Sequence, residues 1–421
     1  MKRLALLLSA LTALAANAEL TLEQCLTEAE KNYPLICKRQ LMEQTCNLSL
    51  SDINRGWLPR LELYGQATAQ NDVPSFPSTL TSVIPDIKGL SHYQYKVGAD
   101  LQQTVWDGGA SSARRGIERA STQENMAALQ VQVYGVRERV ENLFFGILLI
   151  DEQLQQSATN IRLLEANLAK MQSLVKNGVA MQADADMVEA QLLTARQQDT
   201  QARSARAGYS SALGLFLDRD IAGETLVKPE AALPSTLDTK RPELELFSAR
   251  NATFNARLKA IDAQLMPKIG VFAQAYYGYP GLNYFESMMN RNLSFNIIGG
   301  IKVSWSLDAL YTSNNSRKRL QLARQSVDSD RETFEFNTRV QTAAEMADIR
   351  GLQDAMASDS KIVELRAKVR KAAESQLANG VIDTTSLLTK ITDENQSQLT
   401  ARYHEIQLLQ RIYKLRNTLN Q

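Results

Sequence analysis

The sequence contains little of the chemistry that enzymes and metal proteins use. Its 421 residues include two histidines, His92 and His404, and three cysteines, Cys25, Cys37 and Cys46. The cysteines fall in one expected helix, too far apart for an intrahelical disulfide, and an odd number is no disulfide framework, so we expect three buried or half-buried thiols. No metal cluster, nucleophile triad or nucleotide-binding glycine pattern is present. We therefore expect no enzymatic activity, no metal and no cofactor.

Long apolar runs and an excess of one charge are also missing. The longest apolar run after the N-terminus, residues 143–150, is far shorter than the roughly 20 residues of a membrane helix. The chain has 47 Lys and Arg against 46 Asp and Glu, which offers no electrostatic footprint for nucleic acid. If this protein spans a membrane, it must therefore do so with strands.

The N-terminus has the three parts of a secretory signal. Lys2 and Arg3 precede an apolar run, Leu4 to Leu14, and the small residues of 16–18 follow it. This order is typical of a cleaved signal peptide. We expect residues 1–18 to be removed, a mature chain that begins at Glu19, and export from the cytoplasm.

The mature chain repeats itself. The segment from Trp57 to Gly178 recurs about 200 residues later, and its landmarks return in the same order: residues 58–61 as 266–269, and Asn177-Gly178-Val179 as Asn379-Gly380-Val381. Self-similarity of this kind governs a whole fold. We predict a first structural repeat over 19–221, a connector over 222–240 with mixed structure, and a second structural repeat over 241–421.

Each repeat contains two segments in which apolar and polar residues alternate. They predict strands at about 61–70 and 92–105, and at about 268–277 and 292–305, each with an apolar face and a polar face. Strands of this length and pattern are typical of an outer-membrane β-barrel, although a soluble half-buried sheet shows the same alternation. Four strands cannot close a barrel, so a membrane interpretation requires an oligomer.

The rest of each repeat predicts long helices. Residues 110–175 contain no proline and would form a helix of about 100 Å. Apolar residues at spacings of three and four predict a coiled-coil seam in each repeat, at Ile161, Leu164, Leu168, Met171 and Val175, and at Ile362, Leu365, Val369 and Ala372. Turns at 177–183 and 379–383 would return the chain antiparallel over 184–217 and 384–419. Shorter helices, about 21–53 and 241–265, would lead into the strands.

In this order of elements the chain resembles the TolC-type outer-membrane efflux protein family over its full mature length. The residues that carry the resemblance are Leu58-Pro59-Arg60-Leu61, Val105-Trp106-Asp107-Gly108-Gly109 and the two Asn-Gly-Val turns. The resemblance implies a mainly α fold with membrane β structure: a homotrimer whose twelve strands, four per chain, form one outer-membrane barrel continued by a long α-helical barrel in the periplasm.

The resemblance also implies partners and a location. The chain would lie in outer-membrane lipid, with its helical part in the periplasm of a Gram-negative envelope. It would dock to a periplasmic adaptor (membrane fusion) protein and to an inner-membrane pump of RND, ABC or MFS type, with no nucleic-acid partner. It would be the exit duct of a tripartite efflux or type I secretion system.

The helix-to-helix turns are the candidate functional site. Glycine and asparagine suit the left-handed residue after a helix, and the turn residues are candidates for adaptor docking: Asn177, Gly178, Val179, Asn379, Gly380 and Val381. Acids and hydroxyls begin the next helices, where they would cap the helix ends. The resemblance adds a role at the pore or gate of the periplasmic tip for Asp184, Asp186, Asp383, Ser386 and Thr389.

The chain departs from the family at this tip. The family's ring-forming carboxylates, at the sixth and ninth positions after the second glycine, correspond to Ser386 and Thr389. Asp184 matches the acid of the family's locking pair, but Ile382 stands where its base would be. We therefore hypothesise a tip that charge holds more weakly, and that is less cation-selective, than in relatives with these charges.

Other functions remain open at this stage. The first alternative is a secreted or periplasmic structural coiled-coil protein without a barrel, which would be water-soluble. The second is a periplasmic hydrolase, for which no nucleophile constellation is found. The sequence does not distinguish drugs, other small solutes, metals and secreted proteins as cargo.

Single-channel recording in a planar bilayer tests the hypothesis about the tip. We expect less cation selectivity than in relatives with a doubly acidic ring, because only Asp383 remains to supply a lesser ring of charge in the second repeat. Strong cation selectivity that disappears when another carboxylate of the second repeat is removed would contradict it.

Overall fold

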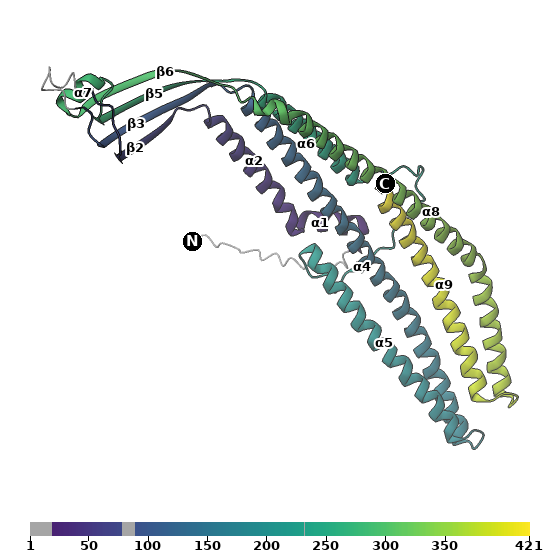
Figure 1. Ribbon diagram of the computed structural model, residues 1–421. Coiled ribbons are helices and arrows are strands. Elements are labelled where there is room, and N and C mark those ends of the chain that lie inside the picture. The colour runs from purple at the N-terminus through teal and green to yellow at the C-terminus, as the bar shows by residue number, and fades with distance from the viewer. Residues whose placement is uncertain (1–18, 78–88, 231) are drawn as a thin grey trace, which may run out of the picture. The chain divides into compact units, whose positions relative to one another are not determined.

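The computed structural model of the chain describes residues 19–77, 89–230 and 232–421 (Figure 1). The expected signal peptide, residues 1–18, lies outside them. The described helices are α1 (Leu22–Asn32), the short 3-10 helix η1 (Pro34–Ile36), α2 (Cys37–Arg55), α4 (Ala110–Lys176), α5 (Gln182–Leu217), α6 (Pro242–Gln264), α7 (Tyr284–Asn290), α8 (Asp308–Ala378) and α9 (Thr384–Leu419). The described strands are β1 (Glu19–Leu20), β2 (Arg60–Ala69), β3 (Tyr93–Trp106), β4 (Thr225–Leu226), β5 (Lys268–Tyr279) and β6 (Ser294–Ser304).

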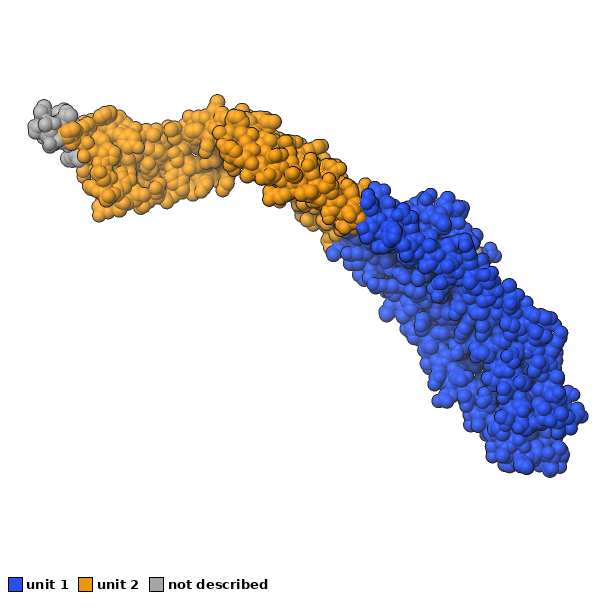
Figure 2. All heavy atoms as spheres, turned by 45° about the vertical axis from the view of Figure 1, so that its right-hand side comes forward, with its two compact units in different colours: residues 1–39, 128–245, 331–421 blue, residues 40–127, 246–330 orange. Residues whose placement is uncertain are grey.

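The chain divides into two compact units, and each contains residues from both halves of the sequence (Figure 2). The first unit consists of the chain up to residue 39, residues 128–245 and residues 331–421. The second consists of residues 40–127 and 246–330. Helices α4 and α8 contribute residues to both units. With 67 and 71 residues they are each about 100 Å long, the length expected from the absence of proline.

The second unit is built on one antiparallel sheet with the strand order β2-β3-β5-β6 (Figure 1). Its strands are observed where the alternating pattern placed them, and β2 and β6 form its two edges. The loop between β5 and β6 contains helix α7, which the pattern did not predict. Asn283 begins this helix by accepting a hydrogen bond from the Glu286 amide, at 3.2 Å. No helix in the described part of the chain is long and apolar enough to cross a membrane.

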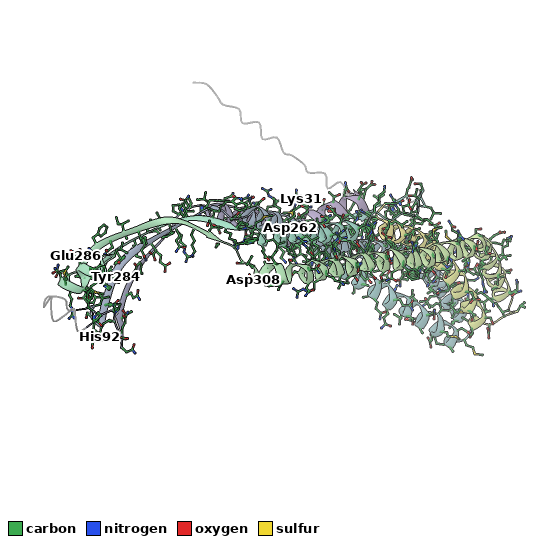
Figure 3. All side chains as sticks on the ribbon, turned by 45° about the horizontal axis from the view of Figure 1, so that its top comes forward. Lys31, His92, Asp262, Tyr284, Glu286 and Asp308 are labelled. Carbon is green, nitrogen blue, oxygen red and sulfur yellow. The ribbon has the colours of Figure 1, made fainter. Side chains whose placement is uncertain are left out.

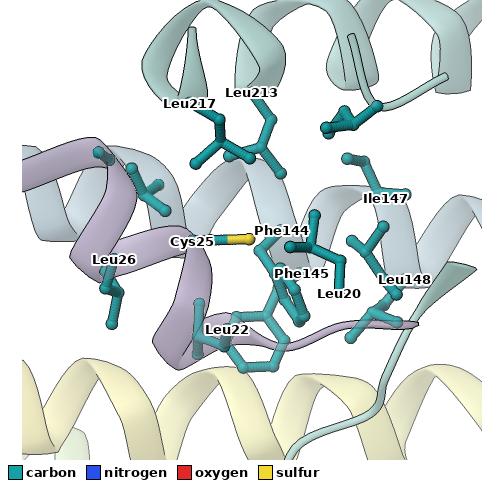
Figure 4. Packing of buried hydrophobic residues seen from close by; sticks show 14 of the residues in the cluster. Leu20, Leu22, Cys25, Leu26, Phe144, Phe145, Ile147, Leu148, Leu213 and Leu217 are labelled. Atoms are coloured by element: carbon teal, nitrogen blue, oxygen red, sulfur yellow. The ribbon is translucent and has the colours of Figure 1, made fainter. Parts of the chain in front are cut away.

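The first unit has its main core where α1 packs onto α4 and α5 (Figure 4). Phe144 and Phe145 on α4 are fully buried beside Cys25 of α1 and Leu213 of α5. The N-terminal residues tie the connector to this core, since Leu20 in β1 pairs in parallel with Leu226 in β4. This pairing of β1 and β4 joins segments about 200 residues apart.

Two expectations for the N-terminal segment are wrong. The helix expected over 21–53 is interrupted at Tyr33, because Pro34 disfavours helical geometry in the residue before it, and Tyr33 is extended with ψ of 126°. The cysteines therefore lie on two helices. All three are free, and Cys25 is buried and Cys46 half-buried as expected, but Cys37 is exposed.

The coiled-coil seams are confirmed in the first repeat only. Leu164 and Met171 on α4 are buried, and Leu164 packs against Leu192 of α5. In the second repeat, Ile362 and Leu365 of α8 are 46% and 49% exposed, and the contact with α9 uses Ala373 and Leu377 instead. Heptad spacing identifies an apolar stripe but not the helix that covers it. The stripe of α8 faces away from α9.

A buried carboxylate lies near the main core. Glu141 on α4 is 7% exposed and lines a cavity of about 340 Å³ together with Arg137, Arg416 and Tyr134. Burial raises the pKa of Glu141 to about 8, an effect that Arg137 partly opposes. Folding therefore favours the protonated form of this side chain.

This shift predicts a stability that falls as pH rises. The folded-state pKa of about 8 exceeds the ordinary value of 4.5, so the native state binds the proton more tightly, and stability is lost between these two values. We expect Glu141→Gln to have a free energy of unfolding roughly 4 kcal/mol above that of the wild type at pH 8, and therefore a higher unfolding temperature, whereas the two should be alike near pH 4.5. Thermal unfolding at several pH values measures this.

Glu189→Gln is the control, because Glu189 is an exposed carboxylate on α5 that does not contribute to the pKa shift of Glu141. Parallel pH profiles for the wild type and Glu141→Gln would contradict the assignment.

Candidate functional site

The two helix-to-helix turns have the same backbone geometry. Gly178 and Gly380 adopt φ of 69° and 70°, the left-handed region that glycine enters without strain. In the first turn the Val179 amide donates to Leu174 and the Gly178 amide to Val175, both at 2.9 Å. The second turn repeats both bonds, from Val381 to Gln376 and from Gly380 to Leu377. Each turn is a Schellman motif, which satisfies the last carbonyls of the incoming helix.

The acids after the turns are engaged by their own helix ends. Asp383 is the N-cap of α9 and accepts the Ser386 amide at 2.8 Å. Hydrogen bonds from the Ser386 side chain and amide lower the pKa of Asp383. In the first repeat, Asp184 accepts the Met181 amide at 3.1 Å, and Asp186 accepts the Gln182 side chain at 2.7 Å. The expectation that Asp184 and Asp383 cap helices is therefore confirmed.

The remaining tip residues predicted from the sequence are hydroxyls and turn side chains. Ser386 is half-buried, and the exposed Thr389 hydroxyl donates to the Thr385 carbonyl at 3.0 Å. Val179 and Val381 are 72% and 69% exposed, so each turn presents an apolar side chain to solvent. Asn177 and Asn379 occupy the C-cap positions before the two glycines.

The two hairpins contact each other just behind the turns. Ile382, at the position where the family has a base, packs with Leu387 and Ile391 of α9. Leu163 of α4 joins the same cluster, and Leu388 of α9 joins the cluster of the first hairpin. Further from the turns, Gln156 donates to Asn395 and Gln398 at 2.7 and 2.6 Å. Apolar packing and neutral hydrogen bonds thus hold the hairpins together here.

Ion pairs within the second hairpin were not predicted. Arg370 of α8 pairs with Glu394 of α9 and with Glu374, and its side chain is largely buried. Arg366 pairs with Asp393 at 2.8 Å. Residues equally far from the turn face each other in an antiparallel hairpin, so counting outward from 379–383 could have found both pairs.

The sheet of the second unit has two chemically different faces. Residues opposite each other in register share a face, so that Glu62, Asp100 and Gln274 lie side by side on the polar one. The opposite face exposes large apolar side chains, among them Leu63, Val97, Ile297, Ile301 and Val303. Figure 3 shows His92, Tyr284 and Glu286 at one end of the strands and Asp262 and Asp308 near the other.

The polar face has few direct contacts between its side chains. The Gln274 amide donates to the Tyr64 hydroxyl at 3.1 Å, and the Lys96 ammonium lies 4.8 Å from the centre of the Tyr276 ring. Gly98 separates Tyr64 from Tyr276: a Cβ at this position would come within 3.0 Å of both. Among the described residues, no group of three or more His, Cys, Asp and Glu side chains could hold a metal.

Comparison with known proteins identifies relatives of this arrangement. Residues 53–217, which lie within the first repeat, match the family model of the outer membrane efflux protein. No curated protein matches the chain.

Several solved structures share the fold. The outer-membrane channel OprN matches with a TM-score of 0.67 and 14% identity, over 94% of this chain and 89% of that chain. The CmeC outer membrane channel of Campylobacter jejuni has a TM-score of 0.66 and 12% identity, over 94% and 85%. The open-state MtrE outer membrane channel of Neisseria gonorrhoeae has a TM-score of 0.64 and 14% identity, over 94% and 88%. The expected mainly α fold with one four-stranded sheet per chain is thereby confirmed.

The left-handed turns allow a test with matched glycine substitutions. Gly178→Ala or Gly380→Ala should destabilise its turn by about 1–2 kcal/mol, because alanine is strained at positive φ. Gly351→Ala should instead stabilise the helix by about 0.5–1 kcal/mol, since Gly351 lies within α8 with open space around its Cα. Amide hydrogen exchange at Val179 and Val381 reports on the turns, and the free energy of overall unfolding reports on the whole chain. Together the two measurements distinguish the turn substitutions from Gly351→Ala. Equal effects of all three substitutions would exclude the Schellman geometry.

Proposed function

We propose that this chain, a TolC-type outer-membrane efflux protein by its family match and its fold, forms a trimeric channel in the outer membrane. The channel is the exit duct of a tripartite efflux or type I secretion system, and its helical part lies in the periplasm. Conduction is passive, and the energy comes from a partner.

The single observation that carries this proposal is the four-stranded sheet with two open edges. β2 and β6 each pair on one side only, and their outer backbone groups need partners wherever water is absent. One face of the sheet is apolar, and all charged strand residues lie on the other face. Three copies joined edge to edge, β2 to β6, would give twelve strands with no free edge, apolar outside and polar inside.

The apolar stripe of α8 supports the same assembly. Ile362, Leu365 and Val369 are between 44% and 49% exposed within one chain. A stripe at spacings of three and four is the packing surface of another helix. In a trimer, a helix of the neighbouring copy covers it, so the helices form a closed wall.

The two turns are the docking surface for the periplasmic adaptor. Both end in an exposed valine, Val179 and Val381, held by the same rigid motif. The pump is of RND, ABC or MFS type. We propose that Asp184, Asp186 and Asp383, with Ser386 and Thr389, surround the pore at this end and contribute to its gate.

A soluble coiled-coil protein is not favoured by the sheet. Monomeric soluble proteins rarely expose a contiguous apolar face, and the strands present one side chain after another to solvent. Burial of that face in lipid removes the cost of exposing it to water.

Two adjacent substitutions test the membrane assignment. Ile297 and Ile298 are neighbours in β6, but Ile297 lies on the apolar face and Ile298 on the polar face. Ile297→Lys should block assembly in the outer membrane, because lysine facing lipid costs about 2–4 kcal/mol near the midplane, whereas Ile298→Lys should be tolerated. Membrane fractionation and the yield of detergent-extracted trimers measure both.

The wild type must remain in the membrane fraction and yield particles of three times the chain mass. A wild-type chain that is water-soluble, or equal loss of trimers in the two variants, would refute the proposed function.

A further inference from the structure

The charged residues of the four strands are unequal in sign. All six lie on the polar face, because the apolar face of β2, β3, β5 and β6 contains none. Four are bases and two are acids: Arg60, Lys96, Lys268 and Lys302, and Glu62 and Asp100. The whole chain has a net charge of +1, so its composition does not reveal this local excess of basic residues.

The register arranges these charges in bands along the strands. Lys268 lies opposite Ser304, and Lys302 lies opposite Gly270, at the end of the sheet where β5 begins and β6 ends. Arg60 lies one level further along the strands, opposite Gln102. Three bases on three strands therefore occupy consecutive levels at one end of the polar face.

The two acids occupy the next level. Glu62 and Asp100 lie directly opposite each other, and Gln274 lies beside Asp100. Lys96 lies two levels further on, opposite Gln66. The acids thus stand between bases on both sides.

In the part of the chain that the structure describes, none of these charges is cancelled by a close partner. Within the described residues none of the six forms an ion pair, and Lys96 instead lies over the Tyr276 ring. Lys268, Lys302 and Asp100 line one hollow of about 420 Å³ on the polar face. Its floor is low in charge elsewhere, with glutamine, threonine and serine side chains and the Phe272 ring.

The spacing of the bands decides which charge a passing solute experiences. Successive levels are two residues apart, or about 7 Å along a strand. This is shorter than the Debye length of about 8 Å at physiological ionic strength, so the fields of neighbouring bands overlap. The net sign of the polar face, rather than any single band, therefore determines the potential near the wall.

From this arrangement we propose that the strand region of the channel selects for anionic solutes. The inference rests on the proposed function, because the polar face lines the lumen only in the closed trimer. Lys268 and Lys302 are its main determinants, since they stand on neighbouring strands without acids at their own levels. The substrate class that the exit favours is therefore small organic anions, such as carboxylates.

Reversal potentials in planar bilayers under a potassium chloride gradient test this. Wild-type trimers should be selective for chloride over potassium, and the preference should weaken as salt rises. Lys268→Gln with Lys302→Gln leaves equal numbers of bases and acids on the polar face, so the preference should disappear. Glu62→Gln with Asp100→Asn should increase it. Replacing chloride by gluconate extends the test to an organic carboxylate.

Arg257→Gln with Lys259→Gln is the matched control, because it removes two exposed bases from α6 outside the sheet. Its reversal potential should equal that of the wild type. Opposite shifts of the reversal potential in the two sheet variants support the proposal. If one variant assembles poorly, the shift in the other variant still tests the proposal. Channels that are cation-selective, or that ignore both sheet variants, overturn the inference and leave the proposed function intact. Failure of the wild type to form channels overturns both.

Discussion

The backbone groups on the outer edges of β2 and β6 are the constraint on which the rest of the structure depends. A sheet of four strands cannot satisfy them alone, and lipid supplies no hydrogen bonds. In the proposed trimer, edge pairing between copies would satisfy these groups, and the register, which places every strand charge on one side, would determine which face meets lipid. The same closure gives the exposed stripe of α8 a neighbour. The need to pair these two edges thus accounts for the apolar sheet face and for the unpartnered helix face.

The long hairpins depend on the turns for their register. A rigid Schellman turn fixes which residues face each other, and the effect extends far from the turn. Arg196 meets Glu165 in the first hairpin, and His404 meets Asp359 in the second, each pair nearly equidistant from its turn. These pairs are partly exposed and contribute little stability individually. Together these pairs favour one register of each hairpin, because a slip of one helix along the other would separate every pair at once.

Much of the fold could be predicted from local patterns, because strands, turns and uninterrupted helices are each encoded within a short window. The local sequence was enough to predict that Gly178 and Gly380 follow helices and that Asp383 caps one. The stripe at Ile362 was predicted too, but its partner was not, since spacing describes a surface and not what covers it. The break at Pro34 was overlooked although its signal is local. The pairing of β1 with β4 left no local signal and could not have been found.

At the candidate site, too, the sequence identified residues but not all of their contacts. Those contacts bear on where the proposed channel selects among solutes. The acids at the tip are committed to their helix ends: Asp383 binds the Ser386 amide and Asp184 the Met181 amide. A capping carboxylate is held close to the helix dipole, which offsets part of its field. Among the residues that the structure describes, the sheet bases Lys268 and Lys302 form no ion pair that would offset their field in this way. In the proposed channel, weak charge at the tip and uncompensated charge on the strands would place the discrimination among solutes at the exit rather than at the entrance.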